Sequence, residues 1–163
     1  MVKIRTLEDG DWPKVWVFME PNIRSGETYP YATDMSSAEA HRMWVDVTEV
    51  AFVAEDESGL VIGTYYIKPN QPTLGAHVAN CGYVVAPESR GKGVATQMCE
   101  HSQVEALERG YRAMQYNLVV ATNDAGYRLW TKMGFDTIGR LVGAFNHSEL
   151  GYVDAYVMYK VLL

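Results

Sequence analysis

Hydrophobic and polar residues alternate along several segments of the chain, which is the pattern of a half-buried β-strand. Residues 2–7 alternate near the N-terminus, and the same period of two returns between Gly151 and Val161. Between them lie β-rich runs that are bounded by turn residues, such as the tract 55–59. The segments that this pattern predicts as strands are 2–7, 51–54, 60–67, 77–85, 113–120 and 151–161.

Four other segments have the apolar spacing or the end signals of helices. Ser36-Ser37-Ala38-Glu39 has the spacing of a capping box, and Asn123 is a good N-cap residue. Gly110 and Gly134 can end the helices that precede them. The connection 21–34 is rich in Pro, Gly, Asn and Tyr and is predicted to be irregular. The predicted helices begin near residues 9, 36, 94 and 123 and end near 20, 47, 109 and 133.

The predicted order is one strand, two helices, three strands, a helix, a strand, a helix and two strands. Of the last two strands, the pattern gives bounds only for the closing one, 151–161. No internal repeat or linker interrupts the 163 residues, a length that suits one hydrophobic core. We therefore expect a single domain, residues 1–163, of the α/β (α+β) class with a mixed sheet.

Composition narrows the classes of partner. A net charge of -6 and a pI near 5.2 argue against nucleic acid, which is bound by clustered Lys and Arg. The chain lacks an apolar run of the ~18 residues that a membrane span needs, and its start does not resemble a signal peptide. Two cysteines fit a reducing compartment, and four histidines without metal-ligand spacing predict no metal. We expect a cytoplasmic protein with no nucleic-acid or membrane partner.

The most informative segment is 83–95, in which a strand, a proline break, a glycine-punctuated turn and a helix start follow one another. Gly91 and Gly93 lack the Cβ atoms that would block close backbone approach, and unpaired amides at a helix start favour an anion. Arg90 and Lys92 add positive charge. The segment lacks the P-loop and dinucleotide fingerprints. It predicts a different phosphate-binding loop, with an ordinary surface turn as the alternative.

Arg90-Gly91-Lys92-Gly93-Val94-Ala95 resembles the R/Q-x-x-G-x-G/A signature of the GCN5-related N-acetyltransferases (GNATs). Residues 123–135 are similar to the family's N-x-x-A-x-x-L-Y-x-x-x-G-F helix, and the resemblance extends from Val2 to about Val161. It implies a single GNAT-like domain with a mixed, mostly antiparallel twisted sheet of six to seven strands flanked by about four helices. It also implies an acetyl-CoA-dependent N-acetyltransferase.

The resemblance further implies how acetyl-CoA is held. The main chain of Val84 and Val85 would pair with the pantetheine arm, the amide of Val85 would polarise the thioester carbonyl, and the glycine loop would hold the pyrophosphate. The cofactor-binding residues implied in this way are Val84, Val85, Arg90, Gly91, Lys92, Gly93, Val94, Ala95, Asn123 and Trp130.

Two positions depart from the family pattern. Gly126 stands where alanine is usual, and Trp130 stands where many members have the tyrosine that protonates the departing thiolate. An indole N–H is too weak an acid for that role, so the tyrosine mechanism does not transfer. Tyr127 is the candidate substitute, and a packed tyrosine is the alternative.

Three asparagines border the expected acceptor site. Asn80 and Asn117 lie within predicted strands, where asparagine is disfavoured, and Asn123 follows the second strand. Their spacing is similar to that of the proline-analogue acetyltransferases that act on azetidine-2-carboxylate, in which such asparagines hold the substrate carboxylate. Asparagines that satisfy a bulge or an edge are the alternative.

The connection between the first two helices lies where GNATs usually build the acceptor pocket. Its Tyr29 and Tyr31 are candidates for an aromatic wall, and Glu27 is a candidate acceptor of the amine proton. We expect acetyl transfer to the amine of a small molecule, an amino acid or an analogue. A protein or peptide acetyltransferase and a non-catalytic acyl-CoA sensor are the alternatives, and a homodimer is left open.

Overall fold

The computed structural model describes residues 1–163 and contains one seven-stranded sheet with the strand order β1-β2-β3-β4-β5-β7-β6. All neighbouring strands are antiparallel except β4 and β5. The prediction of a mixed, mostly antiparallel sheet with about four helices is confirmed. The strands are β1 (Lys3–Thr6), β2 (Val50–Glu55), β3 (Val61–Pro69), β4 (Val78–Val85), β5 (Ala113–Val120), β6 (Asp136–His147) and β7 (Gly151–Val161). The helices are α1 (Trp12–Ser25), α2 (Ser37–His41), α3 (Val94–Glu108) and α4 (Asp124–Lys132).

The helix ends follow local chemistry. The capping box predicted at Ser36 and Glu39 is present, with both reciprocal hydrogen bonds formed. α2 is shorter than predicted because the chain widens into a π-helical turn over Arg42–Asp46. α1 is longer than predicted because it continues through Pro21 and ends only at Gly26, which has a φ of 62°.

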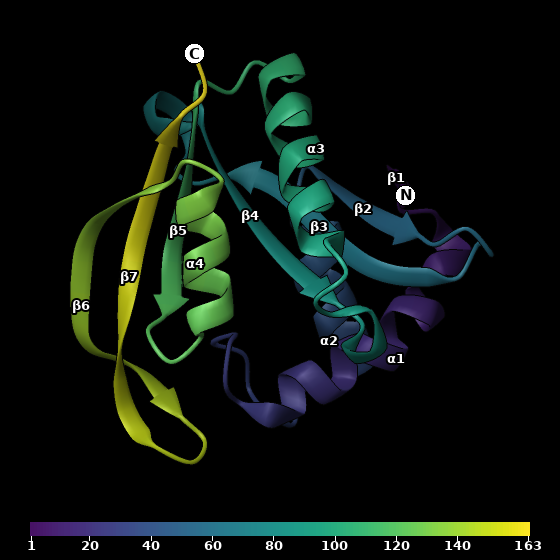
Figure 1. The fold of residues 1–163 in the computed structure, drawn as a ribbon, viewed down its shortest axis with the longest axis horizontal. Helices are drawn as coiled ribbons and strands as arrows, with labels where there is room; N and C mark the ends of the chain where they lie inside the picture. The colour runs from purple at the N-terminus through teal and green to yellow at the C-terminus, as the bar shows by residue number, and fades with distance from the viewer.

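The helices cover both faces of the sheet (Figure 1). α3 packs on β3 and β4, and α4 packs beside β5, while α1 packs on the opposite face of β3 and β4. A hydrophobic core of 30 buried residues lies between these layers. The core fixes the central strands, and the site is built where two of them separate.

β4 and β5 run parallel but pair only at Val78–Ala113 and Ala79–Met114. Beyond these pairs the two strands diverge, as Figure 1 shows. β5 is also irregular between Tyr116 and Val119, where its register with β7 shifts. A bulge increases local twist and bends its strand. The bulge therefore helps to hold open a gap in the middle of the sheet.

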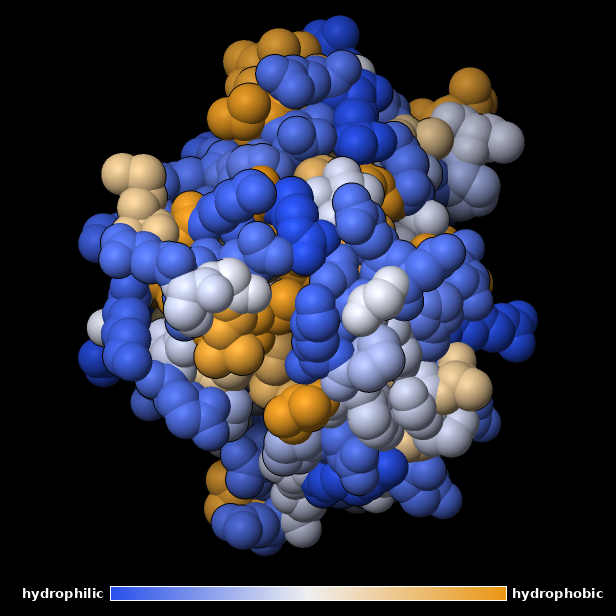
Figure 2. All heavy atoms as spheres, turned by 90° about the vertical axis from the view of Figure 1, so that its right-hand side faces the viewer, coloured by the Kyte–Doolittle hydropathy of each residue, from blue (hydrophilic) through white to orange (hydrophobic).

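The side of the molecule that carries the β1–β2 edge is largely hydrophilic, with apolar atoms in small scattered groups, some in the centre of the view and some at its rim (Figure 2). None of the helices is long and apolar enough to cross a membrane. Cys81 and Cys99 are both buried free thiols.

Candidate active site

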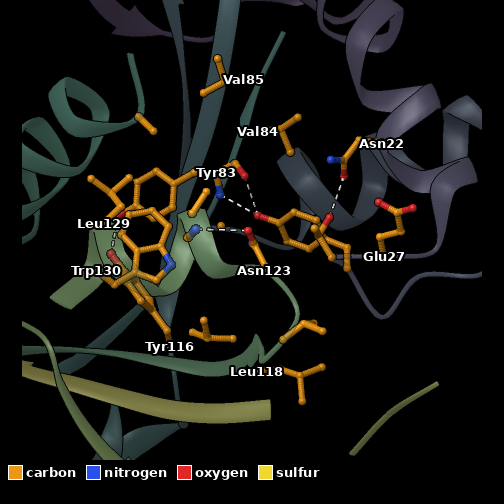
Figure 3. Close-up of a pocket in the computed structure, with 18 of the residues that line it drawn as sticks. Asn22, Glu27, Tyr83, Val84, Val85, Tyr116, Leu118, Asn123, Leu129 and Trp130 are labelled. Carbon is orange, nitrogen blue, oxygen red and sulfur yellow. Dashed lines mark hydrogen bonds between the residues drawn. The ribbon is translucent and has the colours of Figure 1, made fainter. Parts of the chain in front are cut away.

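A cleft of about 1130 Å³ occupies the gap between β4 and β5. Two groups of segments line it. The first group, at what we call the first end of the cleft, contains the glycine loop, the start of α3 and the start of α4. The second group, at the second end, contains the α1–α2 connection, β3 and the β6–β7 turn. Figure 3 shows these groups on opposite sides of Tyr83, with Leu129 and Trp130 on one side and Asn22 and Glu27 on the other.

The glycine loop presents backbone amides to the first end of the cleft. Gly91 and Gly93 have φ values of 73° and 78°, and the space beside each α-carbon is open. Gly93 is the N-cap of α3 and no side chain caps this end, so the first amides of the helix have no partner within it. Arg90 lines the cleft, whereas Lys92 lines a separate shallow depression beside the N-terminus.

Strand β4 turns alternate backbone groups toward the gap. Ala86 donates to Ile62 and Asn70 donates to Val78, so even-numbered β4 residues bond to β3. The main chain of Val84 therefore faces β3, and the prediction that it pairs with the pantetheine arm does not fit this geometry. The groups that face the gap belong to the odd-numbered residues, including Tyr83 and Val85.

Tyr29 occupies the gap-facing groups of Tyr83. Its hydroxyl accepts from the Tyr83 amide at 2.7 Å and donates to the Tyr83 carbonyl at 2.8 Å (Figure 3). Gly82 makes room for this contact, because a Cβ there would lie 3.1 Å from the hydroxyl. Burial raises the pKa of Tyr29 far above its ordinary value of 10, so the phenol stays neutral.

Aromatic side chains form one wall at the second end of the cleft. The rings of Tyr29 and Tyr31 stack at 5.5 Å, and Trp44 packs edge-on against Tyr29 and Tyr66. Burial raises the pKa of Tyr31 to about 12. Arg24 fixes the connection by donating to carbonyls of Thr33 and Met35. Glu27 is exposed and lines the cleft.

The three predicted asparagines all line the cleft, and each side chain already makes at least one hydrogen bond within the protein. Asn80 is buried, donates to the Gln115 carbonyl at 2.9 Å and accepts from the Tyr66 hydroxyl at 3.3 Å. It thus ties β4 to β5 just beyond their last pair. Asn117 is exposed and donates to the Asn70 side chain at 2.7 Å, and Asn123 caps α4. Their roles toward a substrate stay predictions.

The geometry suits acetyl-CoA at the first end. Open glycines and unpaired helix amides match a pyrophosphate, and gap-facing β4 groups match an extended amide-bearing arm. The model of the acetyltransferase (GNAT) family matches residues 4–135. The chain belongs to the GNAT family of N-acetyltransferases.

Relatives agree with this assignment. N-acetyltransferase aca1 of Schizosaccharomyces pombe is 30% identical, over 86% of this chain and 75% of that protein. A GNAT structure from Kribbella flavida is 36% identical, with a TM-score of 0.92 over 98% of this chain and 97% of that one. A GNAT phosphinothricin acetyltransferase from Sinorhizobium meliloti, in complex with AcCoA, shares the fold at 20% identity, with a TM-score of 0.88 over 98% and 88%.

Trp130 stands at the position where many GNATs have tyrosine, and its side chain packs against other aromatic rings. The indole of Trp130 lies 4.9 Å from the Tyr83 ring and 5.0 Å from the Tyr116 ring, measured between centroids. Tyr127 does not line the cleft: its hydroxyl bonds Thr137 at 2.9 Å, and its ring packs on β7. The prediction that Tyr127 replaces the missing acid is therefore wrong, because its side chain lies on the β6–β7 side of α4.

Two residues that line the cleft of this GNAT are not indicated by any sequence pattern. Lys68 is half-buried, and its ammonium lies 5.4 Å from the Tyr66 ring centroid with no carboxylate within salt-bridge distance. His147, the last residue of β6, is buried where the β6–β7 turn begins. Neither has a motif around it, so only the fold brings them to the cleft.

Proposed function

We propose that this GNAT transfers the acetyl group of acetyl-CoA to the amine of a small amino acid or amino-acid analogue. Lys68 carries the proposal. It is a half-buried cation that lines the cleft without an anionic partner. An amino acid's carboxylate would supply that partner, whereas a polyamine would place further positive charge beside Lys68.

The chain's own groups account for the main requirements of acyl transfer. Bound acetyl-CoA supplies the activated thioester. A gap-facing β4 amide, at Val85 or at Tyr83 once Tyr29 moves away, donates to the carbonyl oxygen on which negative charge develops. Glu27 accepts the amine proton directly or through water. The aromatic wall excludes solvent around the acceptor, and the start of α3 holds the pyrophosphate.

The enclosure of the second end favours a small acceptor over a protein. The backbone amide of Ser148 donates to the Gly26 carbonyl at 3.2 Å, and its hydroxyl donates to the Ser25 carbonyl at 2.6 Å. These bonds join the β6–β7 turn to the end of α1, so two segments that line the second end of the cleft are tied to each other. Proline analogues such as azetidine-2-carboxylate belong in the acceptor panel, since Asn117 and Asn80 border the same space.

The test compares an amino acid with its decarboxylated amine in wild type and in Lys68→Met. Loss of a hydrogen bond to a charged group costs about 1.5 to 3 kcal/mol, so we expect kcat/KM for the amino acid to fall roughly ten- to a hundredfold. The amine should change little, and acetyl-CoA affinity should stay the same. Arg112→Met, which removes an exposed cation outside the cleft, is the control.

Equal losses on both acceptors would contradict a carboxylate-binding role for Lys68. Acetylation of peptides but of no free amino acid would overturn the proposed function. Binding of acetyl-CoA without turnover on any amine would favour the sensor.

A further inference from the structure

The β6–β7 turn is organised by the side chain of His147. Its Nδ1 atom accepts hydrogen bonds from the backbone amides of Glu149 at 3.1 Å and Leu150 at 3.3 Å. A ring nitrogen that accepts N–H groups carries no hydrogen itself, so these two bonds assign the neutral ring's hydrogen to Nε2. The turn therefore holds His147 as a hydrogen-bond donor of fixed tautomer.

The donor has no partner within the protein. His147 is 8% exposed, and no hydrogen bond is formed at Nε2. Every side-chain nitrogen or oxygen atom that is completely buried in the protein has a hydrogen-bond partner. Nε2 must then retain some exposure. His147 lines the cleft together with Glu149 and Leu150, so the cleft is the place to look for a partner of Nε2.

The position of His147 is fixed by its neighbour in the turn. Ser148 is bonded to Ser25 and Gly26 at the end of α1. The contact is close, because a Cβ on Gly26 would lie 3.2 Å from the Cβ of Ser148. The turn is thus docked beside the connection that carries Glu27 and Tyr29, at the acceptor end and not on the phosphate loop.

We propose that His147 is a specificity-determining residue whose Nε2–H donates to a carboxylate oxygen of the acceptor molecule. This inference rests on the proposed function, since it concerns the same acceptor. An N–H donor does not suit the reacting amine, whose lone pair must remain free for attack. In this tautomer Nε2 also has no lone pair with which to act as a base, so recognition of an oxygen is the role left to it.

Two substitutions separate the two nitrogens of the ring. The Oδ1 atom of asparagine stands as many bonds from Cβ as Nδ1 does, so His147→Asn keeps the acceptor of the turn. Its Nδ2 stands where the ring has Cδ2, so the donor at the Nε2 position is lost. The Nε2 atom of glutamine corresponds to the ring Nε2, so His147→Gln keeps a donor and loses the turn's acceptor.

With an amino acid and its decarboxylated amine as acceptors, we expect His147→Asn to lower kcat/KM roughly ten- to a hundredfold for the amino acid alone. The thermal midpoint and acetyl-CoA affinity should stay near wild type. His147→Gln should lower the thermal midpoint and retain more of the preference for the amino acid over the amine than His147→Asn does. Full activity of His147→Asn on the amino acid, or equal losses on both acceptors, would overturn the proposal and leave His147 as a turn residue.

A measurement independent of turnover tests the same assignment. Long-range proton–nitrogen NMR of wild type with CoA should show His147 as the Nε2–H tautomer, and N-acetylglycine should shift its Nε2 signal more than its Nδ1 signal. An Nδ1–H tautomer would overturn the inference even if amino acids are acetylated. If wild type acetylates only amines without a carboxylate, the proposed function fails and the inference fails with it, whatever the tautomer.

Discussion

Trp130 illustrates how one side chain changes what the family mechanism can mean in this enzyme. Its indole covers Tyr83 and Tyr116, whose hydroxyls bond each other at 2.9 Å. Burial raises the pKa of both tyrosines well above their ordinary values, so they are neutral donors at physiological pH. Trp130 therefore shapes the wall of the cleft and does not act as an acid.

We predict that Trp130→Phe retains most of the turnover, because a phenyl ring keeps the packing and the indole supplies no proton. Tyr127→Phe, outside the cleft, should be equally mild and serves as the matched control. Steady-state kinetics at saturating acetyl-CoA measure both. A loss of about a hundredfold or more, the scale of a general acid, would contradict the assignment for whichever variant showed it.

At the scale of elements, the separation of β4 from β5 and the loop before α3 together make the end of the cleft to which we assign acetyl-CoA. Only two residue pairs join the strands, and Asn80 then bridges them through its side chain. The loop reaches α3 through glycines in the left-handed region, which allows its amides to converge. The phosphate site is thus a property of backbone shape.

We predict that Gly93→Ala weakens CoA binding by about tenfold or more, since a methyl group would enter the open space beside the amides. Left-handed backbone at alanine costs about 1 to 2 kcal/mol, so stability should also fall. Gly59→Ala is the matched control. Gly59 has a φ of 84° in the β2–β3 turn, with equally open space and no place in the cleft. Calorimetry should show lost CoA affinity for Gly93→Ala alone; equal affinities would remove the phosphate loop from the site.

At the scale of the whole molecule, an ionic cluster ties the first strand to the rest of the fold. Arg5 on β1 bonds Asp11, which precedes α1, at 2.6 and 3.0 Å, and it also bonds Glu55 on β2. Asp11 is buried, and the Arg5 guanidinium holds the pKa of its carboxyl at about 2, below the ordinary 3.8. The cluster therefore joins the N-terminal segment, from β1 to the start of α1, to β2, which is 50 residues away in sequence.

We predict that this cluster makes the free energy of unfolding depend on pH in the acid range. A carboxyl whose pKa is lowered by folding stabilises the protein fully above the unfolded value of 3.8, and the contribution is lost as pH falls toward 2. Asp11→Asn should therefore unfold more easily at pH 7, by up to about 2 kcal/mol. The difference from wild type should shrink between about pH 4 and pH 2. Denaturant unfolding across this range measures it, and a constant difference would show that the charge of Asp11 is not responsible.

The parts of the enzyme that the sequence predicted are those governed by local chemistry. Alternating and β-rich segments predicted the positions of all strands except β6, Ser36 and Glu39 predicted a formed capping box, and the 90–95 segment predicted the family. These signals are readable because strand period, helix capping and glycine conformation depend on neighbours along the chain. The extension of α1 through Pro21 was missed because tertiary packing of its apolar face outweighs one lost hydrogen bond.

The acceptor end was decided by the tertiary structure. The side-chain amide of Asn80 donates to the carbonyl of Gln115, and the hydroxyl of Tyr127 bonds Thr137. The hydroxyl of Tyr29 bonds Tyr83, which is 54 residues away in sequence. Lys68 and His147 carry no motif and become candidate recognition groups only because β3 and the β6–β7 turn meet the same cleft. Sequence patterns report the period and the chemistry of a segment, whereas a binding site depends on which distant side chains share one desolvated space. That is set by strand order, by the β5 bulge and by the docking of the turn on α1.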